Sequence, residues 1–408
     1  MLFLSEGWMQ AFKAELNSDV GWSEASKYFS ARVSFKGDKA IGTIDVRDGV
    51  IVSAIASAHP LGADITITGP DREWDRISSG ETDWFQGMSP GLGELAIEGD
   101  AVCALRNVKT MWLALSAMRR IGRSEKQYKD FSPPPKPSGR PTTGHYIEVD
   151  GIRTYYEEAG EGYPIICFHA ACQDTLMYRH VLDGLSDEFR VISVDAPAHA
   201  KSLEPEGGEF KSLTSHCAFN EKLIAKLGLD RPVLIGCSMS GNQVLELGSR
   251  NPDGYAAIIS SEGADYTPTV SQFLLDMLLI NGQQVLEGWS QSLTGYRTPP
   301  DRAREVVWQI RKTNPEVMRG DLTGYAGFDR RGEVGKIKSP VLLLRGDADW
   351  LVSQQQVEDT QGRIPGSEIS VLAGTGHYPM IENPFEFNEA VRSFLHSKGI
   401  GKTAATFD

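Results

Sequence analysis

Apolar side chains predict a helix at the start of the chain and strands soon after it. In the first 20 residues they recur every four positions, at Leu4, Trp8, Phe12 and Leu16. This spacing is that of one face of an amphipathic helix. From about residue 33 to residue 67, apolar positions alternate with polar ones, and turn residues separate the runs. The alternation predicts an antiparallel meander of short strands.

Three more elements complete this first part: a short helix over 23–29, a strand over 93–99 and a final helix. The final helix is expected over 102–118, where the sequence VCALRNVKTMWLALSAM is largely apolar. Helices that precede and follow a meander indicate a small α+β domain. We place this domain at residues 1–130.

Prolines then indicate a boundary. The segment FSPPPKPSGRPTT, residues 131–143, is rich in proline. Proline has a fixed φ angle and no backbone N–H, so such a segment favours extended backbone over helix or sheet. We interpret residues 131–143 as a semi-rigid linker and residues 144–408 as a second domain.

In the second domain, apolar runs alternate with helical patterns. Strands are predicted over 146–149, 152–157, 163–168, 191–196, 232–237, 255–260, 340–346 and 368–374. Helices are predicted between several of them, over 211–227, 240–250 and 353–362. Near-continuous apolar strands are typical of a parallel sheet that is buried on both faces. The alternation therefore predicts a doubly wound α/β domain.

One connection is far longer than an ordinary loop. Roughly 80 residues separate the strands at 255–260 and 340–346, whereas most loops have only a few. The segment of about 264–335 has helical patterns and several aromatic residues, among them Trp289, Trp308 and Tyr325. It is predicted to form a helical lid over an apolar pocket. The alternative is a structural insertion that buries its own aromatic side chains.

Composition and charge narrow the classes of function. Of the 408 residues, 40% are hydrophobic and 23% are charged, as in ordinary globular proteins. The formal net charge of −13 argues against nucleic acid or an anionic membrane as a partner. No apolar run reaches the roughly 18 residues of a transmembrane helix, and the N-terminus lacks the basic region of a signal peptide. We expect a cytoplasmic protein without stable membrane insertion.

The five cysteines form no CxxC pair. Neither a disulfide framework nor a zinc site is predicted, and a reducing compartment suits them.

A candidate nucleophile follows the strand at 232–237, which runs directly into Ser238 and then into a helical stretch. A serine on a tight strand-to-helix turn projects from the sheet, and the residues two positions before and after it must be small. Gly236 and Ser240 meet that requirement, so G-x-S-x-G is matched except at its last position. The alternative is a strand that ends in a small-residue turn without function.

Two further residues complete the order Ser, Asp, His that this architecture uses. Asp349 follows the strand at 340–346, and Asp347 is the second choice because turn aspartates are common. His377 follows the last strand, in GTGHYPMIENP. An aspartate can orient such a histidine and stabilise its charged form. We predict a triad of Ser238, Asp349 and His377.

Acyl transfer also needs N–H donors for the oxyanion. One is expected from Met239, directly after the nucleophile, and the other from Ala171, in the turn after the strand at 163–168. Cys172 comes next and either lines the pocket or serves in packing. The candidate pocket residues are Cys172, Trp289, Trp308 and Tyr325.

With these residues in place, the chain from about Gly144 to Ser397 resembles the α/β-hydrolase superfamily. GCSMSG resembles its nucleophile elbow, DAPAHAKS resembles its DxxGHGxS segment, and its GxxD and GxxH patterns occur at 346–349 and 374–377. The resemblance implies the α/β-hydrolase fold and a serine nucleophile. Where the family usually has glycine, this chain has Ala170, Ala198, Ala200 and Ser240. These departures bear on the geometry of the oxyanion loop and on the choice of substrate, and they do not change the expected fold.

Residues of about 1–122 resemble a sterol carrier protein 2 (SCP2)-type domain. The resemblance rests on the helix, the meander and AIEGDAVCALRNVKTMWLALSAM, which is similar to the family's strand, Gly-Asp and closing helix. It implies an apolar tunnel for lipids. Three roles follow from it: binding of a lipophilic substrate, a homodimer contact, or a cover for the mouth of the hydrolase site.

These features together predict an α/β-hydrolase fold with a helical lid, preceded by a small α+β SCP2-like domain. The expected activity is hydrolysis of a carboxylic ester, thioester or lactone of a hydrophobic small molecule through an acyl-enzyme, without a metal or organic cofactor. One alternative is hydrolysis of a carbon–carbon bond in a ring-fission product, because GCSMSG also resembles the elbow of such enzymes. Another is a lipid carrier whose hydrolase part is vestigial.

Overall fold

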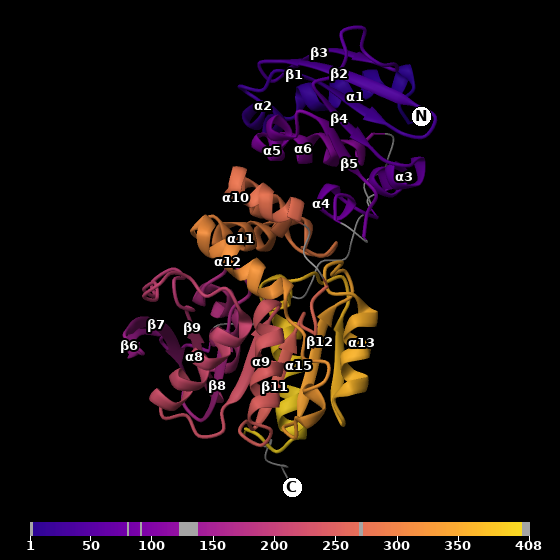
Figure 1. Ribbon diagram of the computed structural model, residues 1–408. Helices are drawn as coiled ribbons and strands as arrows, with labels where there is room; N and C mark the ends of the chain where they lie inside the picture. The colour runs from indigo at the N-terminus through magenta and orange to yellow at the C-terminus, as the bar shows by residue number, and fades with distance from the viewer. Residues whose placement is uncertain (1–2, 80, 90–91, 122–137, 269–271, 402–408) are drawn as a thin grey trace. The chain divides into compact units, whose positions relative to one another are not determined.

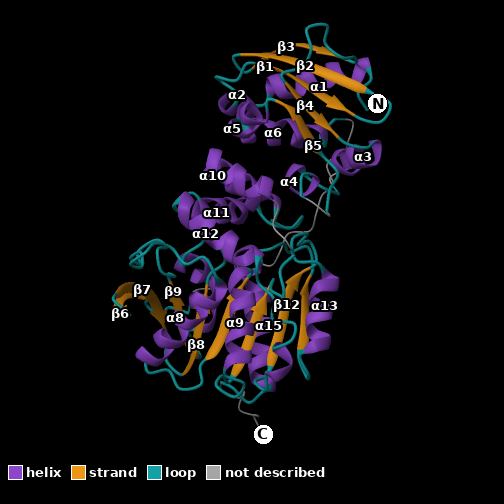
Figure 2. Ribbon diagram, viewed as in Figure 1, coloured by secondary structure: helices purple, strands orange, loops and turns teal. Residues whose placement is uncertain are grey.

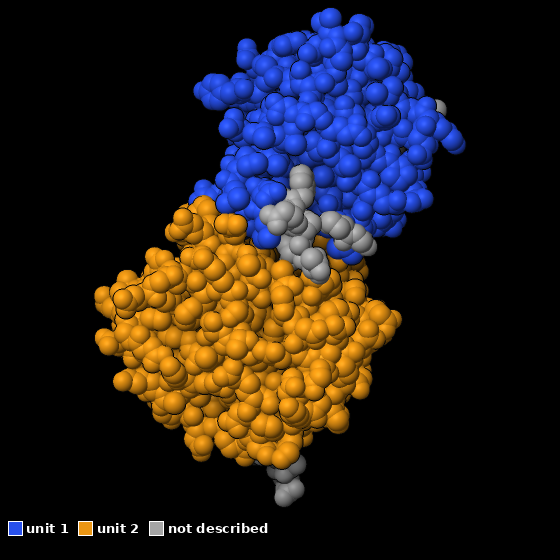
Figure 3. All heavy atoms as spheres, in the orientation of Figure 1, with its two compact units in different colours: residues 1–127, 271–292 blue, residues 128–270, 293–408 orange. Residues whose placement is uncertain are grey.

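The computed structural model describes residues 3–401, with gaps at 80, 90–91, 122–137 and 269–271. The chain divides into two compact units (Figure 3). The N-terminal unit comprises residues 1–127 and 271–292, and the C-terminal unit comprises residues 128–270 and 293–408. Most of the expected linker lies outside the described residues. In the described part of the chain, no helix is both long enough and apolar enough to cross a membrane.

The N-terminal unit is built on a five-stranded sheet in the order β3-β2-β1-β4-β5 (Figure 1). Its strands are β1 (Ala31–Lys36), β2 (Ile41–Arg47), β3 (Val50–Ile55), β4 (Ile65–Thr68) and β5 (Ala96–Gly99). Its helices are α1 (Glu6–Ser18), α2 (Val20–Ala25), α3 (Asp71–Ser79), α4 (Trp84–Gly87), α5 (Ala101–Arg106), α6 (Val108–Met118) and α10 (Gln272–Ser292).

Helix α1 has the predicted amphipathic form, with its apolar stripe buried. Its polar side chains bind the edge strand β3. Lys13 Nζ donates to Val52 O at 2.8 Å, and the Asn17 amide bonds both the N–H and the C=O of Ile51 at 2.9 and 3.0 Å. An edge strand exposes unpaired backbone groups that could pair with another chain. Helix α1 therefore closes the β3 edge of the sheet.

The structure differs from the sequence prediction in several places of this unit, among them the helices α3 and α4, which were not predicted. The sheet is mixed, because β4 pairs parallel with β1 and antiparallel with β5; alternation sets the face of each side chain, not the direction of pairing. The short helix begins earlier than predicted, at Val20, where the Asp19 carboxylate caps Trp22 N–H at 2.9 Å. The closing helix is broken at Asn107, whose side-chain amide donates to Cys103 O at 2.9 Å.

The segment expected to form one lid divides between the two units. Helix α10 packs on α5 and α6 of the N-terminal unit. Lys109 and Glu287 form an ion pair there at 3.0 Å, and Asn281 Nδ2, at a kink in α10, donates to Arg106 O at 2.9 Å. Helices α11 (Pro300–Ile310) and α12 (Pro315–Ala326) belong to the C-terminal unit.

The C-terminal unit has an eight-stranded sheet in the order β13-β12-β11-β10-β8-β9-β7-β6. Its strands are β6 (Thr143–Val149), β7 (Ile152–Ala159), β8 (Tyr163–Phe168), β9 (Phe189–Val194), β10 (Val233–Cys237), β11 (Ala257–Ser261), β12 (Val341–Gly346) and β13 (Glu368–Leu372). Strands β8 to β13 pair in parallel, whereas β7 and β6 add an antiparallel edge.

Helices flank this sheet (Figure 2). They are α7 (Arg179–Leu185), α8 (Leu213–Lys226), α9 (Met239–Arg250), α13 (Gln354–Arg363), α14 (Pro379–Glu382) and α15 (Pro384–Ser397), with short 3₁₀ turns at Thr175–Tyr178 and Val334–Lys336. The central strands β10 and β11 are buried over their whole length, as the apolar runs predict.

The strand order changes direction between β8 and β10. The chain goes from β8 outward to β9 on one side, and later returns to place β10 on the other side of β8. Ligands of open α/β sheets bind at the carboxyl ends of the strands beside such a switch point. The candidate residues Ala171 and Ser238 follow β8 and β10 respectively, so both lie at this position.

Candidate active site

Ser238 occupies a strained turn between β10 and α9. Its backbone angles are φ 55° and ψ −118°, a region that residues other than glycine rarely adopt. A Cβ on Gly236 would lie 2.0 Å from Ser240 O, so the turn needs glycine at that position. This geometry is that of a nucleophile elbow, which exposes a serine hydroxyl at the edge of the sheet.

Ser240, which replaces the usual last glycine of the elbow, has a specific contact. Its hydroxyl donates to His169 O at 2.6 Å and so connects the elbow to the loop that follows β8. The atoms that crowd a Cβ on Gly236 most closely are all backbone atoms, namely Ser240 O, Ser240 C and Gly241 N. The departure from the family pattern therefore adds a hydrogen bond between two neighbouring loops.

His377 and Asp349 form a buried pair. The Nδ1–H of His377 donates to Asp349 Oδ2 at 2.7 Å, and Leu351 N–H donates to Asp349 Oδ1 at 2.8 Å. Burial raises the pKa of Asp349, but the charge and the hydrogen bond of His377 outweigh it and lower that pKa. Asp349 therefore stays ionised and fixes the tautomer in which Nε2 of His377 is the open nitrogen.

Asp347, the second choice for the acid, has a different role. Its Oδ1 accepts the N–H of Gly374 at 2.6 Å. This contact holds the turn after β13 against the turn after β12. The structure thus places Asp349 against His377 and Asp347 at the base of the histidine loop.

Ser238 and His377 come from segments that touch. The thiol of Cys237 donates to His377 O at 3.5 Å, and Ser238 itself is buried to 6% exposure. Among the hydrogen bonds of the described residues, none joins Ser238 Oγ to the imidazole. Catalytic hydrogen bonds are often long in unliganded enzymes and shorten in the substrate complex.

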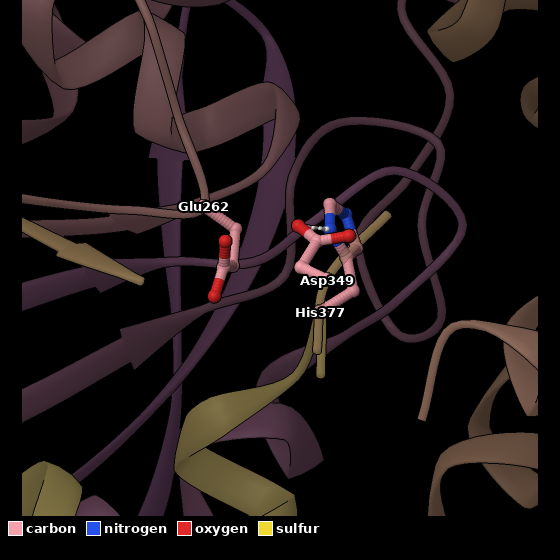
Figure 4. A group of neighbouring side chains, drawn as sticks. All are labelled: Glu262, Asp349 and His377. Atoms are coloured by element: carbon pink, nitrogen blue, oxygen red, sulfur yellow. Dashed lines mark hydrogen bonds and ion pairs between the residues drawn. The ribbon is translucent and has the colours of Figure 1, made fainter. Parts of the chain in front are cut away.

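Glu262, which the sequence interpretation missed, lies beside this pair (Figure 4). It follows β11 and is fully buried, and one of its carboxylate oxygens lies within 4.8 Å of a carboxylate oxygen of Asp349 and of a ring nitrogen of His377. Burial first, and then the neighbouring Asp349 carboxylate, raise the pKa of Glu262 well above its usual range. A protonated Glu262 can donate to Asp349. A carboxyl group at the end of a buried strand was the available sequence signal.

These three side chains are also the one group of potential metal ligands that the described residues bring together. Asp349 Oδ2 and His377 Nδ1 already form a hydrogen bond with each other. The N–H of Gly346 donates to Glu262 in the same way.

A second buried carboxylate holds the histidine loop. Glu382 of α14 accepts the N–H groups of Gly295, Gly376 and Tyr378 at 2.7, 2.9 and 2.8 Å. The N–H of His377 donates to Leu293 O at 2.9 Å. The segment that follows α10 therefore braces the loop that carries His377.

The two expected oxyanion donors share one cluster. Met239 is buried with Leu213, Tyr325 and Phe328, and Ala171 packs against this group. Neither the N–H of Met239 nor that of Ala171 takes part in a hydrogen bond among the described residues. Both N–H groups are thus available at the carboxyl ends of neighbouring strands.

The remaining candidate pocket residues lie in different places. Tyr325 of α12 is 6% exposed in the Met239 cluster, and Cys172 is buried with its N–H bound to Asp321 of the same helix. Trp308 of α11 is 58% exposed. Trp289 belongs to α10 of the N-terminal unit, where its ring contacts Phe85.

The sequence of this region matches a known family. The model of the family described as alpha/beta hydrolase fold matches residues 163–384, more than half of the chain. The chain belongs to the α/β-hydrolase family. The match spans β8 to α14 and includes the elbow, the aspartate turn and the histidine loop described above.

Individual relatives of this α/β hydrolase are distant. The chain is 23% identical to the pimeloyl-[acyl-carrier protein] methyl ester esterase of Vibrio cholerae, over 59% of this chain and 97% of that protein. It is 21% identical to the 2-(acetamidomethylene)succinate hydrolase of Mesorhizobium japonicum, over 61% of this chain and 94% of that protein. The enol-lactonase of Burkholderia xenovorans shares its fold, with a TM-score of 0.58 and 21% identity over 62% of this chain and all of that chain.

Proposed function

We propose that this α/β hydrolase is a serine hydrolase that cleaves a carboxylic ester, thioester or lactone of a hydrophobic small molecule. The observation that carries the proposal is the buried His377–Asp349 pair beside a serine on a strained elbow. A histidine that is oriented by a carboxylate, with its second nitrogen open, is the general base that a serine nucleophile needs.

The proposed reaction uses five groups. Ser238 Oγ attacks the carbonyl carbon while His377 Nε2 takes its proton, and Asp349 stabilises the imidazolium. The oxyanion accepts hydrogen bonds from the N–H groups of Met239 and Ala171. His377 returns the proton to the leaving alcohol or thiol, and then activates a water molecule that hydrolyses the acyl-enzyme.

Two observations support an ester of an apolar acid. The Met239 cluster presents Leu213, Tyr325 and Phe328 beside the elbow, and apolar side chains with a few polar groups are typical of small-molecule sites. Among the relatives, the Vibrio cholerae protein is an esterase.

Hydrolysis of p-nitrophenyl esters of increasing acyl length tests the proposal. We expect turnover by the intact chain, with a preferred length that measures the pocket, and loss of turnover in Ser238→Ala. Ser397→Ala, at the end of α15, is a matched control that keeps full activity. Absence of turnover with every ester would contradict the proposal and favour hydrolysis of a carbon–carbon bond, which a vinylogous diketone acid would reveal.

For the N-terminal unit we propose an SCP2-like role in binding a lipophilic group. A five-stranded sheet with helices at both ends of its sequence supports this. The test is titration of the intact chain with a fluorescent fatty acid. We expect saturable binding that Ser238→Ala leaves unchanged. No binding, together with dimers in sedimentation, would instead assign the unit to a homodimer contact.

A further inference from the structure

A second histidine–carboxylate pair is buried in the C-terminal unit. Asp321 of α12 and His199, in the loop after β9, have side chains that are each 1% exposed. Asp321 Oδ2 accepts from His199 Nε2 at 2.9 Å and from the N–H of Cys172 at 2.8 Å. One carboxylate oxygen therefore joins three separate segments: the α12 helix, the loop after β9 and the loop after β8.

The hydrogen bonds of His199 show that this pair is ionic. Its Nδ1 lies 2.9 Å from Pro197 O, and its Nε2 faces Asp321. Both partners are acceptors, so both ring nitrogens carry protons. Burial lowers the pKa of His199, but Asp321 outweighs burial and raises it, while the same contact lowers the pKa of Asp321. Two opposite charges thus lie together in the protein interior.

The neighbouring imidazoles remain neutral and do not compete for this proton. His169 donates through Nδ1 to Ala170 O at 2.8 Å and accepts Ala196 N–H at Nε2 at 3.0 Å. His216 Nε2 lies 4.0 Å from Asp321 Oδ1, outside hydrogen-bond distance. Of the buried histidines around Asp321, His199 is the charged partner.

Backbone strain gathers on both sides of the pair. Ala198 and Ala200, which flank His199, have φ angles of 68° and 43°, and Cys172 has a φ of 64°. These are left-handed conformations that favour glycine. Non-glycine residues keep such conformations only where surrounding contacts hold them in place. The bonds from Asp321 to His199 and to Cys172 N–H supply those contacts.

The strained loop carries the proposed oxyanion donor. Cys172 is the residue after Ala171, and His169, two residues before Ala171, accepts the Ser240 hydroxyl. Tyr325 lies one helical turn after Asp321 and packs in the Met239 cluster against Ala171. The α12 helix therefore contacts the loop at two adjoining points.

We propose that Asp321, through its ion pair with His199, is a positioning residue that sets the Ala171 N–H toward the oxyanion and makes α12 a fixed wall of the site. This inference rests on the proposed serine hydrolase function. Moving α12 away would leave two buried charges without partners, which is strongly unfavourable.

The chain offers a matched control on the neighbouring helix α11. Glu305 is 11% exposed and binds His180 of α7 at 3.1 Å and Arg179 at 2.7 Å. Like Asp321, it joins a helix of the expected lid to the sheet domain through a histidine. Its described contacts lie outside the loop after β8.

The test compares Asp321→Ala, Asp321→Asn and Glu305→Ala in the intact chain. With a p-nitrophenyl ester we expect Asp321→Ala to lower kcat about 30-fold and leave KM within about threefold, because oxyanion bonds form only in the transition state. Asp321→Asn keeps an acceptor for Cys172 N–H and recovers part of the loss. Glu305→Ala keeps kcat within about twofold despite a lower Tm.

A second readout reports on the oxyanion site directly. An alkylboronic acid forms a tetrahedral adduct with an active serine, and its affinity should fall in parallel with kcat across the Asp321 variants. Two results would overturn the inference. One is that wild type and Asp321→Asn have equal kcat and equal affinity for the boronic acid. The other is that kcat falls in Asp321→Ala and in Glu305→Ala in proportion to the loss of Tm. The rate of labelling of Ser238 by a fluorophosphonate separates the two proposals: an unreactive wild type contradicts the hydrolase function, whereas equal rates in wild type and the Asp321 variants contradict the positioning role alone.

Discussion

Two buried histidine–carboxylate pairs occupy the C-terminal unit, and they differ in one nitrogen. In the pair of His377 and Asp349, Nδ1 is bound, and Nε2 has no partner among the described hydrogen bonds. In the pair of His199 and Asp321, both ring nitrogens donate, one to the carboxylate and one to Pro197 O. The first imidazole can accept a proton, whereas the second already carries both.

This difference between the two histidines predicts different roles for them. A histidine with one unprotonated nitrogen can act as a general base. An imidazolium whose two N–H groups both donate hydrogen bonds cannot accept a proton and can only keep its neighbours in position. The two pairs also connect different segments: the first joins the turns after β12 and β13, and the second joins α12 to the loops after β8 and β9. A buried histidine beside an aspartate is therefore not by itself a sign of catalysis.

The largest expected effect on kcat comes from replacing His377, and replacing His199 in the same way gives the comparison. We expect His377→Ala to lower kcat about 10,000-fold, because loss of the base leaves a free serine hydroxyl as nucleophile. His199→Gln should lower kcat only about 30-fold, since it loosens the oxyanion loop. Steady-state kinetics with one p-nitrophenyl ester measures both. Equal losses would mean that the two pairs do not differ in role.

The carboxylates should differ in the same way. Asp349→Asn is expected to lower kcat about 1,000-fold, because an amide cannot stabilise the imidazolium that forms in the reaction. Asp321→Asn should cost less than tenfold, since it still accepts a hydrogen bond from Cys172 N–H. A pH–rate profile of each variant checks this. A larger loss for Asp321→Asn than for Asp349→Asn would refute the assignment of roles.

A third histidine sharpens the comparison through stability. Burial lowers the pKa of His216 to about 4; Asp321 opposes this shift, and His199 and His169 add to it. His216 therefore binds a proton below about pH 6.5 in the unfolded chain, but only below about pH 4 in the native state. The free energy of unfolding falls as the pH is lowered from 6.5 to 4. The loss is roughly 3 kcal/mol for this residue. Urea unfolding of His216→Leu between pH 7 and 4.5 should show a shallower decline, and an unchanged decline would contradict a neutral buried His216.

The smallest expected effect concerns Glu262, a third group beside the first pair that forms a cluster with it. Glu262→Gln keeps a donor for Asp349 and should retain kcat within about threefold, whereas Glu262→Leu removes it and should lower kcat about tenfold. In wild type, burial and the Asp349 carboxylate raise the pKa of Glu262, and its ionisation as the pH rises places a second charge beside Asp349. The pH–rate profile should therefore change in Glu262→Gln. Identical profiles for all three proteins would mean that Glu262 bears no proton shared with Asp349.

The sequence predicted those parts of the site that depend on local pattern. Ser238 stands between a buried strand and a helix with small residues around it, and Asp349 and His377 each follow an apolar strand. Order and spacing were therefore enough to name these residues as candidates, and the triad itself stays a prediction. The sequence favoured Asp349 and kept Asp347 as the second choice, and in the structure it is Asp349 that lies 2.7 Å from His377.

The parts that escaped prediction depend on contacts between distant segments. Glu262, Asp321 and Glu382 are ordinary acidic residues in the sequence, and their roles arise only where separate loops meet. Helix α10 has a clear helical pattern, but amphipathicity does not say which unit will bury its apolar face. The parallel pairing of β4 with β1 escaped because alternation of apolar and polar residues does not set the direction of pairing.

The central claim is that Ser238 is a nucleophile activated by His377. Its most direct test is to treat the intact chain and His377→Ala with a fluorophosphonate and to locate the adduct by peptide mass spectrometry. The account predicts one adduct, on Ser238, that forms rapidly in the intact chain and is nearly absent from His377→Ala. An adduct on another residue, or equal labelling of Ser238 in both proteins, would contradict it.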